Sequence, residues 1–120
     1  MTANELEQGK AYDCRRDGDN SLEKTTIIPV ALDPQTNQRF VIIGARELLR
    51  SNPFFLRSLL RMSFCEIVNE DLEGGPHREW SSHVWKFSIG EHGSLYYEDF
   101  DCYLEDFAPT TLPDITKSED

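Results

Sequence analysis

Tyr97-Glu98-Asp99-Phe100-Asp101-Cys102-Tyr103-Leu104-Glu105-Asp106-Phe107 carries the most informative pattern in the chain, because five of its eleven residues are acidic and none is basic. Read as a helix, the stretch repeats apolar residues at i, i+3, i+4 and i+7 and so places them on one face. These residues are Phe100, Tyr103, Leu104 and Phe107. Read as a strand, it turns alternate residues from Glu98 to Leu104 to one side and those from Asp99 to Glu105 to the other. Both readings stay open, and both leave an apolar side for anchoring and a row of carboxylates in water.

The negative charge of the chain is concentrated in its second half. The net charge is −10, from 22 acidic and 12 basic residues. Residues 1–61 hold 8 acidic and 9 basic side chains, whereas residues 62–120 hold 14 acidic and 3 basic ones. Such a charge promotes solubility, and it opposes direct binding to nucleic acids or anionic membranes, which are polyanions. It favours a basic partner.

The segments before this stretch predict strands and turns. Thr25 to Leu32 is rich in β-branched residues and predicts a strand, in which Pro29 indicates a sheet edge or a bulge. A polar loop separates it from a second strand over Arg39 to Ile43, and the two form an antiparallel hairpin. Lys10 to Arg15 predicts a short strand with Tyr12 and Cys14 on the same side.

The clearest strand pattern covers Trp80 to Ile89, where apolar and polar residues alternate and Trp85, Phe87 and Ile89 share a side. Two glycines flank the turn that follows, over residues 90–93, and Ser94 to Tyr97 begins the returning strand.

One main helix is predicted over residues 53–62. Asn52 can cap its N-terminus, and Pro53 is tolerated in its first turn, where a missing N–H costs nothing. Phe54 falls away from the apolar stripe and is expected to be exposed. The stripe itself consists of Phe55, Leu56, Leu59 and Leu60.

These elements predict an α+β fold: an antiparallel sheet of four or five strands with one or two packed helices, the second helix lying near 99–107. A chain of 120 residues with 38% hydrophobic composition favours a single domain over 1–120. We expect residues 1–9 and 108–120 to be extended or flexible at its two ends.

No catalytic, cofactor or metal signature is present in the sequence. The three cysteines are widely spaced, which favours a reduced cytoplasmic protein over a disulfide scaffold, and no signal peptide or membrane-spanning run is visible. His77, His83 and His92 match no zinc spacing, so we expect no metal, no cofactor and no enzyme activity.

The acidic row, mixed with aromatic residues, suits a protein–protein interface. In size and charge the chain resembles small acidic DNA-mimic and inhibitor proteins, which implies a non-catalytic protein that occupies the basic surface of a nucleic-acid-binding protein. An immunity-type inhibitor of a basic toxin or nuclease is the alternative, and a small enzyme is the second alternative. We expect a monomer or weak dimer. The predicted contact residues are Glu98, Asp99, Asp101, Glu105, Asp106, Glu70, Asp71, Glu73, Tyr97 and Tyr103.

Overall fold

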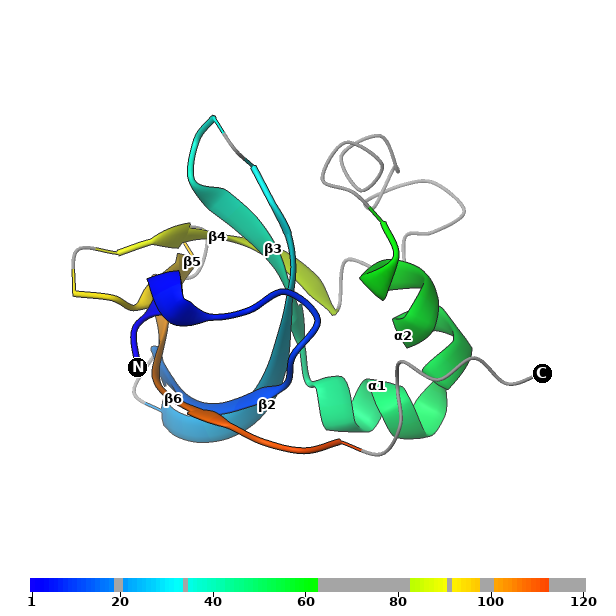
Figure 1. The fold of residues 1–120 in the computed structure, drawn as a ribbon. Coiled ribbons are helices and arrows are strands. Elements are labelled where there is room, and N and C mark those ends of the chain that lie inside the picture. Colours follow the sequence, from blue (N-terminus) through cyan, green and yellow to red (C-terminus); the bar gives the residue numbers. More distant parts are fainter. Residues whose placement is uncertain (19–20, 34, 63–82, 91, 98–100, 113–120) are drawn as a thin grey trace.

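Six antiparallel strands close into a barrel, and two short helices lie beside it (Figure 1). The structure is a computed structural model, and it describes residues 1–18, 21–33, 35–62, 83–90, 92–97 and 101–112. The strands are β1 (Tyr12–Gly18), β2 (Ser21–Leu32), β3 (Gln38–Ile43), β4 (Val84–Ile89), β5 (Leu95–Tyr97) and β6 (Cys102–Pro109). The helices are the 3₁₀ helix η1 (Ala3–Glu5) and the α-helices α1 (Ala45–Ser51) and α2 (Pro53–Leu60).

The predicted antiparallel sheet of four or five strands with one or two packed helices is wrong, because six strands are present and the first and last of them pair with each other. In the ladder between β1 and β6, Asp13 lies opposite Ala108, and Arg15 lies opposite Glu105. Each remaining strand pairs with its neighbour in sequence, so closure leaves the described sheet without an unpaired edge. The second helix expected near 99–107 is also wrong, since Cys102–Pro109 forms β6.

A bulge in β6 explains why this stretch resembles a helix. The β1–β6 register shifts between Asp13 and Arg15, and Asp106 has a positive φ of 59°. Such an extra residue resets the alternation of a strand. Leu104 and Phe107, three residues apart, are therefore both buried in the same apolar cluster.

The barrel interior holds one of two apolar clusters. It draws residues from every strand and from the N-terminal segment. Its buried members are Ala3, Leu6, Tyr12, Cys14, Ile27, Val41, Ile43, Phe87, Leu95, Leu104 and Phe107. The shared side of Tyr12 and Cys14 is confirmed, and Trp85 and Ile89 pack against the same cluster as Phe87.

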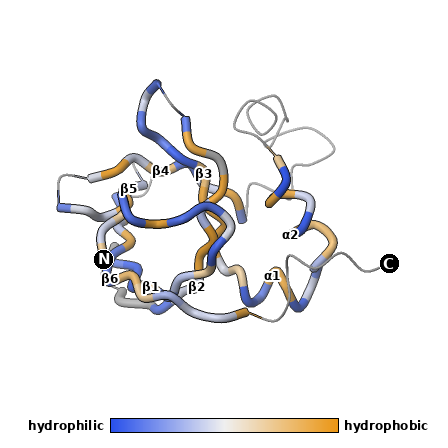
Figure 2. Tube along the Cα trace, in the orientation of Figure 1, coloured by the Kyte–Doolittle hydropathy of each residue, from blue (hydrophilic) through white to orange (hydrophobic). Residues whose placement is uncertain are grey.

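The second cluster joins the helices to the outer face of β2 and β3. Consecutive residues of β3 face opposite clusters, Phe40 and Ile42 toward the helices and Val41 and Ile43 toward the barrel interior. A strand that is covered on both faces becomes a continuous apolar run. Figure 2 shows the hydrophobic residues along β3 and in the helices beside it.

The helix prediction around α2 is confirmed. The Asn52 side chain accepts a hydrogen bond from the Phe55 backbone N–H at 3.0 Å, as an N-cap should. Phe55, Leu56 and Leu59 are buried, and Phe54 is 75% exposed. The predicted β2–β3 hairpin and the β4–β5 hairpin are also confirmed.

Pro29 lies beside an irregularity in the β2–β3 ladder, as the bulge alternative predicted. Its carbonyl accepts a hydrogen bond from the Gly9 N–H at 2.8 Å. The pairing of β1 with β2 ends at Tyr12 and Ile27, so Pro29 lies outside that ladder. The missing N–H of proline therefore removes no bond between β1 and β2.

None of the helices in the described part of the chain is long and apolar enough to cross a membrane.

Candidate partner-binding surface

The described residues are balanced in charge. They include ten acidic and ten basic side chains, whereas the remaining positions hold twelve acidic and two basic ones. The net charge of −10 therefore comes entirely from residues 19–20, 34, 63–82, 91, 98–100 and 113–120. Among the predicted contact residues, Glu98, Asp99, Glu70, Asp71 and Glu73 lie outside the described residues.

The outer face of β5 and β6 brings together part of the predicted site. Tyr103 is 40% exposed, and its ring lies 4.8 Å from that of Tyr96, its partner across the two strands. The Tyr96 hydroxyl donates a hydrogen bond to Asp101 Oδ1 at 3.2 Å. The outward residues here are Tyr96, Asp101, Tyr103, Glu105 and Asp106.

Tyr97 lies on the opposite side of β5. Its ring stacks on Trp85 at 4.7 Å and packs against the barrel interior. Tyr96 takes the outward position that the sequence analysis gave to Tyr97. The alternation could have shown this, because the buried Leu95 lies on the same side as Tyr97.

Arg15 partly neutralises the acidic row. Its Nη2 atom lies 3.6 Å from Glu105 Oε1 and 3.2 Å from Asp106 Oδ2, and all three side chains are substantially exposed. Arg15 stands on β1 directly opposite Glu105, so strand pairing brings these charges together. Asp101, in contrast, forms no ion pair with any residue that the structure describes.

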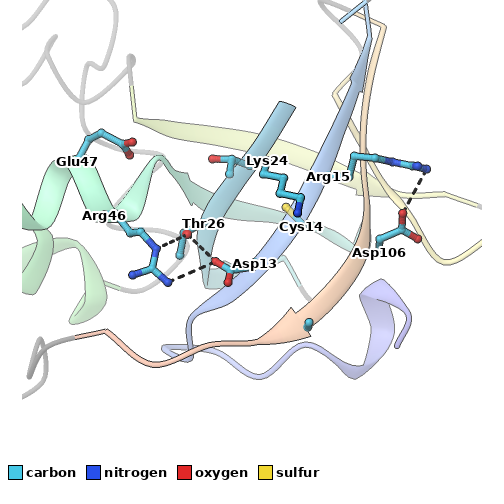
Figure 3. Close-up of a pocket in the computed structure, with 10 residues that line it drawn as sticks. Asp13, Cys14, Arg15, Lys24, Thr26, Arg46, Glu47 and Asp106 are labelled. Carbon is cyan, nitrogen blue, oxygen red and sulfur yellow. Dashed lines mark hydrogen bonds and ion pairs between the residues drawn. The ribbon is translucent and has the colours of Figure 1, made fainter. Parts of the chain in front are cut away.

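A groove of about 550 Å³ lies between α1 and the outer face of β1, β2 and β6 (Figure 3). Three of its side chains, Asp13, Thr26 and Arg46, bond to one another. Thr26 Oγ1 donates to Asp13 Oδ1 at 2.7 Å and accepts from Arg46 Nε at 2.9 Å. Arg46 Nη2 also lies 3.6 Å from Asp13 Oδ1 and donates to Thr110 Oγ1 at 2.9 Å. This network ties α1 to the barrel.

The hydrogen bond from Thr26 lowers the pKa of Asp13, and Thr110 and Arg46 add to the effect, while partial burial opposes it. A carboxyl with a lowered pKa in the folded state stabilises the fold above its unfolded pKa of about 3.9. That stabilisation is lost as the pH falls through the folded pKa. Asp13→Asn should therefore lower the free energy of unfolding at pH 7, by less than about 1 kcal/mol for this half-exposed pair.

Urea unfolding of the wild type and Asp13→Asn at pH 7, 4 and 2.5 measures this effect. The difference between the two proteins should shrink as the pH falls, because protonation of Asp13 removes its charge. A difference that stays constant over this range would show that the charge of Asp13 does not stabilise the fold.

Both cysteines that the structure describes are buried, and no hydrogen bond joins either of them to a histidine there. Cys14 is buried in the barrel, and burial raises its pKa to about 12, which disfavours the reactive thiolate. His83 and His92 lie at opposite ends of β4, and His77 lies outside the described residues. No group of three or more potential metal ligands occurs within the described residues.

Comparison with protein-family models, curated proteins and solved structures finds no match to this chain.

Proposed function

We propose that the protein is a non-catalytic binding protein that occupies the basic surface of a nucleic-acid-binding protein in the cytoplasm. The observation that carries this proposal is the exposed Tyr103, whose ring packs against that of Tyr96 beside the carboxylate of Asp101. This tyrosine pair lies next to residues 98–101 in the sequence, which we call the β5–β6 connection and which include Glu98 and Asp99 as well as Asp101.

The combination of rings and carboxylates suits such a partner. Tyrosines are enriched at protein interfaces because they bury a large apolar ring while keeping a polar hydroxyl available. Three acids within five residues of sequence, 97–101, repel one another, and a basic surface relieves that repulsion. Lysine and arginine side chains that normally contact phosphates can pair with these carboxylates instead.

The groove supports a non-catalytic role. Asp13, Thr26 and Arg46 bond to one another there, so their polar atoms serve the packing of α1. The buried free thiols of Cys14 and Cys102 fit a reducing compartment such as the cytoplasm.

Binding should depend on the acids of the β5–β6 connection more than on net charge. We expect the triple variant Glu98→Gln, Asp99→Asn and Asp101→Asn to weaken partner binding by about tenfold or more and to reduce its salt dependence. The matched control is Glu5→Gln, Glu7→Gln and Glu47→Gln, which removes the same charge elsewhere and should bind as the wild type does.

The measurement uses immobilised protein and the heparin-retained fraction of a lysate from the source cells, washed at several salt concentrations. Circular dichroism checks that both variants are folded. Equal loss of binding in the two triple variants would reduce the effect to net charge, and unchanged binding in the first would exclude the β5–β6 connection as the contact.

Competition with duplex DNA separates the two kinds of inhibitor. A protein that occupies a DNA-binding groove should release its partner when duplex DNA of unrelated sequence is added. The proposal would be contradicted if the protein retained a single nuclease, if duplex DNA did not release that nuclease, and if binding abolished its activity. That result would indicate an immunity protein.

A further inference from the structure

Arg39 is the one charged residue that the described part of the chain buries deeply, with 6% of its surface exposed. It lies on the inward face of β3 at the end of the barrel that residues 1–9 cross (Figure 1). Its Nη2 atom donates to the Val30 carbonyl at 2.9 Å, and Nη1 reaches the Leu6 carbonyl at 3.4 Å. Its Nε atom has no hydrogen-bond partner among the described residues.

This guanidinium has no counter-charge in the described part of the chain. None of the salt bridges among the described residues involves Arg39. Burial lowers the pKa of Arg39, with interaction from Tyr12 opposing the effect, but an arginine stays charged at neutral pH. An unpaired buried charge is destabilising, and neutral carbonyls compensate it less well than a carboxylate does. The site is therefore suited to an anion.

The Leu6–Glu7 peptide group now occupies the position in front of Arg39. The oxygen of this group accepts from Arg39, and its N–H donates to the Tyr12 hydroxyl at 2.9 Å. The Leu6 side chain is 5% exposed and belongs to the interior cluster. An aliphatic side chain and a planar polar group thus lie side by side between Arg39 and Tyr12.

A peptide C-terminus presents the same two groups in the same covalent order. In a terminal carboxylate, a second oxygen replaces the nitrogen of the next residue. One oxygen would face Arg39, and the other would face Tyr12, whose hydroxyl can donate as well as accept. The bond to Arg39 would then be charge-assisted, whereas the present contact to a neutral carbonyl is long at 3.4 Å.

We propose that this end of the barrel is a binding site for the C-terminal carboxylate of a peptide that ends in leucine, and that residues 1–9 occupy it when no such peptide is bound. Arg39 and Tyr12 hold the carboxylate, and the leucine side chain replaces that of Leu6. Opening releases the bonds from Ala3 N–H to Gly93 O at 2.7 Å and from Gly9 N–H to Pro29 O at 2.8 Å, together with the two bonds of the Leu6–Glu7 peptide group. It also exposes the buried Ala3 side chain, whereas the leucine of the peptide takes the place of Leu6.

This site is independent of the proposed function, because the two use different ends of β5. Residues 1–9 bond through Ala3 to Gly93, which precedes β5, whereas Tyr97 and Cys102 pair at the other end of that strand. Failure of one proposal therefore leaves the other standing.

The test compares two synthetic pentapeptides that end in leucine, one with a free carboxylate and one with a C-terminal amide. The amide reproduces the contacts of the Leu6–Glu7 peptide group, so the difference between the two peptides measures the charge. Titration of the full chain followed by nuclear magnetic resonance should show at least about tenfold tighter binding of the free acid. Binding should also speed tryptic cleavage after Lys10, because residues 1–9 are displaced.

Two variants sharpen the test. Leu6→Ala weakens the occupant of the site and should tighten binding of the free acid by about tenfold or more, because a larger fraction of the protein is open. Arg39→Met keeps the aliphatic bulk without the charge and should remove the difference between acid and amide. Thermal unfolding shows whether each variant is folded.

Equal binding of acid and amide to the wild type would overturn the proposal, as would the absence of binding of the free acid to the wild type at millimolar peptide. Both results are read on the wild type, so a variant that fails to fold does not prevent a decision.

Discussion

Phe87→Ala should lower the free energy of unfolding by about 3–5 kcal/mol, because it removes a large ring from the centre of the barrel. Phe87 has 0% exposure, and its ring centroid lies 5.5 Å from that of Tyr97 and 6.2 Å from that of Trp85. The closed ladder of six strands restricts any inward collapse. Much of the space left by the ring should therefore remain as a cavity.

Phe54→Ala is the matched control for this prediction. The same side chain is removed, but Phe54 is 75% exposed on α2, so its loss should change stability by less than about 0.5 kcal/mol. Urea unfolding followed by circular dichroism measures both variants. Similar losses for the two would mean that the described interior of the barrel is not the core of the protein.

Leu59→Ala should cost about 2–5 kcal/mol, for a different reason. Leu59 has 0% exposure and belongs to the cluster between the helices and the outer face of β2 and β3. Its loss weakens the attachment of the helices, whereas Phe87 acts inside the barrel. Leu32→Ala is the control, since Leu32 is 42% exposed near the end of β2.

The slope of the urea transition gives the second readout for Leu59→Ala. An unchanged slope shows that the helices and the barrel unfold together, and a reduced slope shows that the helices detach first. A loss below about 0.5 kcal/mol would contradict the burial of this face of α2.

The sequence predicted the local elements better than their assembly. Asn52 followed by Pro53 indicated the start of α2, and the alternation around Phe87 indicated β4, because caps and periodicity act over a few residues. Pairing between β1 and β6 depends on residues far apart in the sequence, and no local pattern encodes its register. The bulge at Asp106 further hid β6 by giving a strand the apolar spacing of a helix.

The candidate surface was predictable only in part. The acidity of residues 97–107 indicated a charged surface, and the structure places Tyr103, Glu105 and Asp106 on the outside of β6. The neutralising role of Arg15 follows from strand pairing and was not visible in the sequence. The burial of Arg39 was equally hidden, since an arginine at the start of a strand is ordinarily exposed.

The closure of β1 on β6 also has a consequence during protein synthesis. A chain that emerges from the ribosome N-terminus first presents β1, and the hydrogen-bonding groups along one side of that strand have no partner until β6 has been made. During this interval β1 is open to pairing with strands of other nascent chains, which is a common route to aggregation. Synthesis and pairing of β6 thus end the period in which the nascent chain is most prone to aggregation through β1.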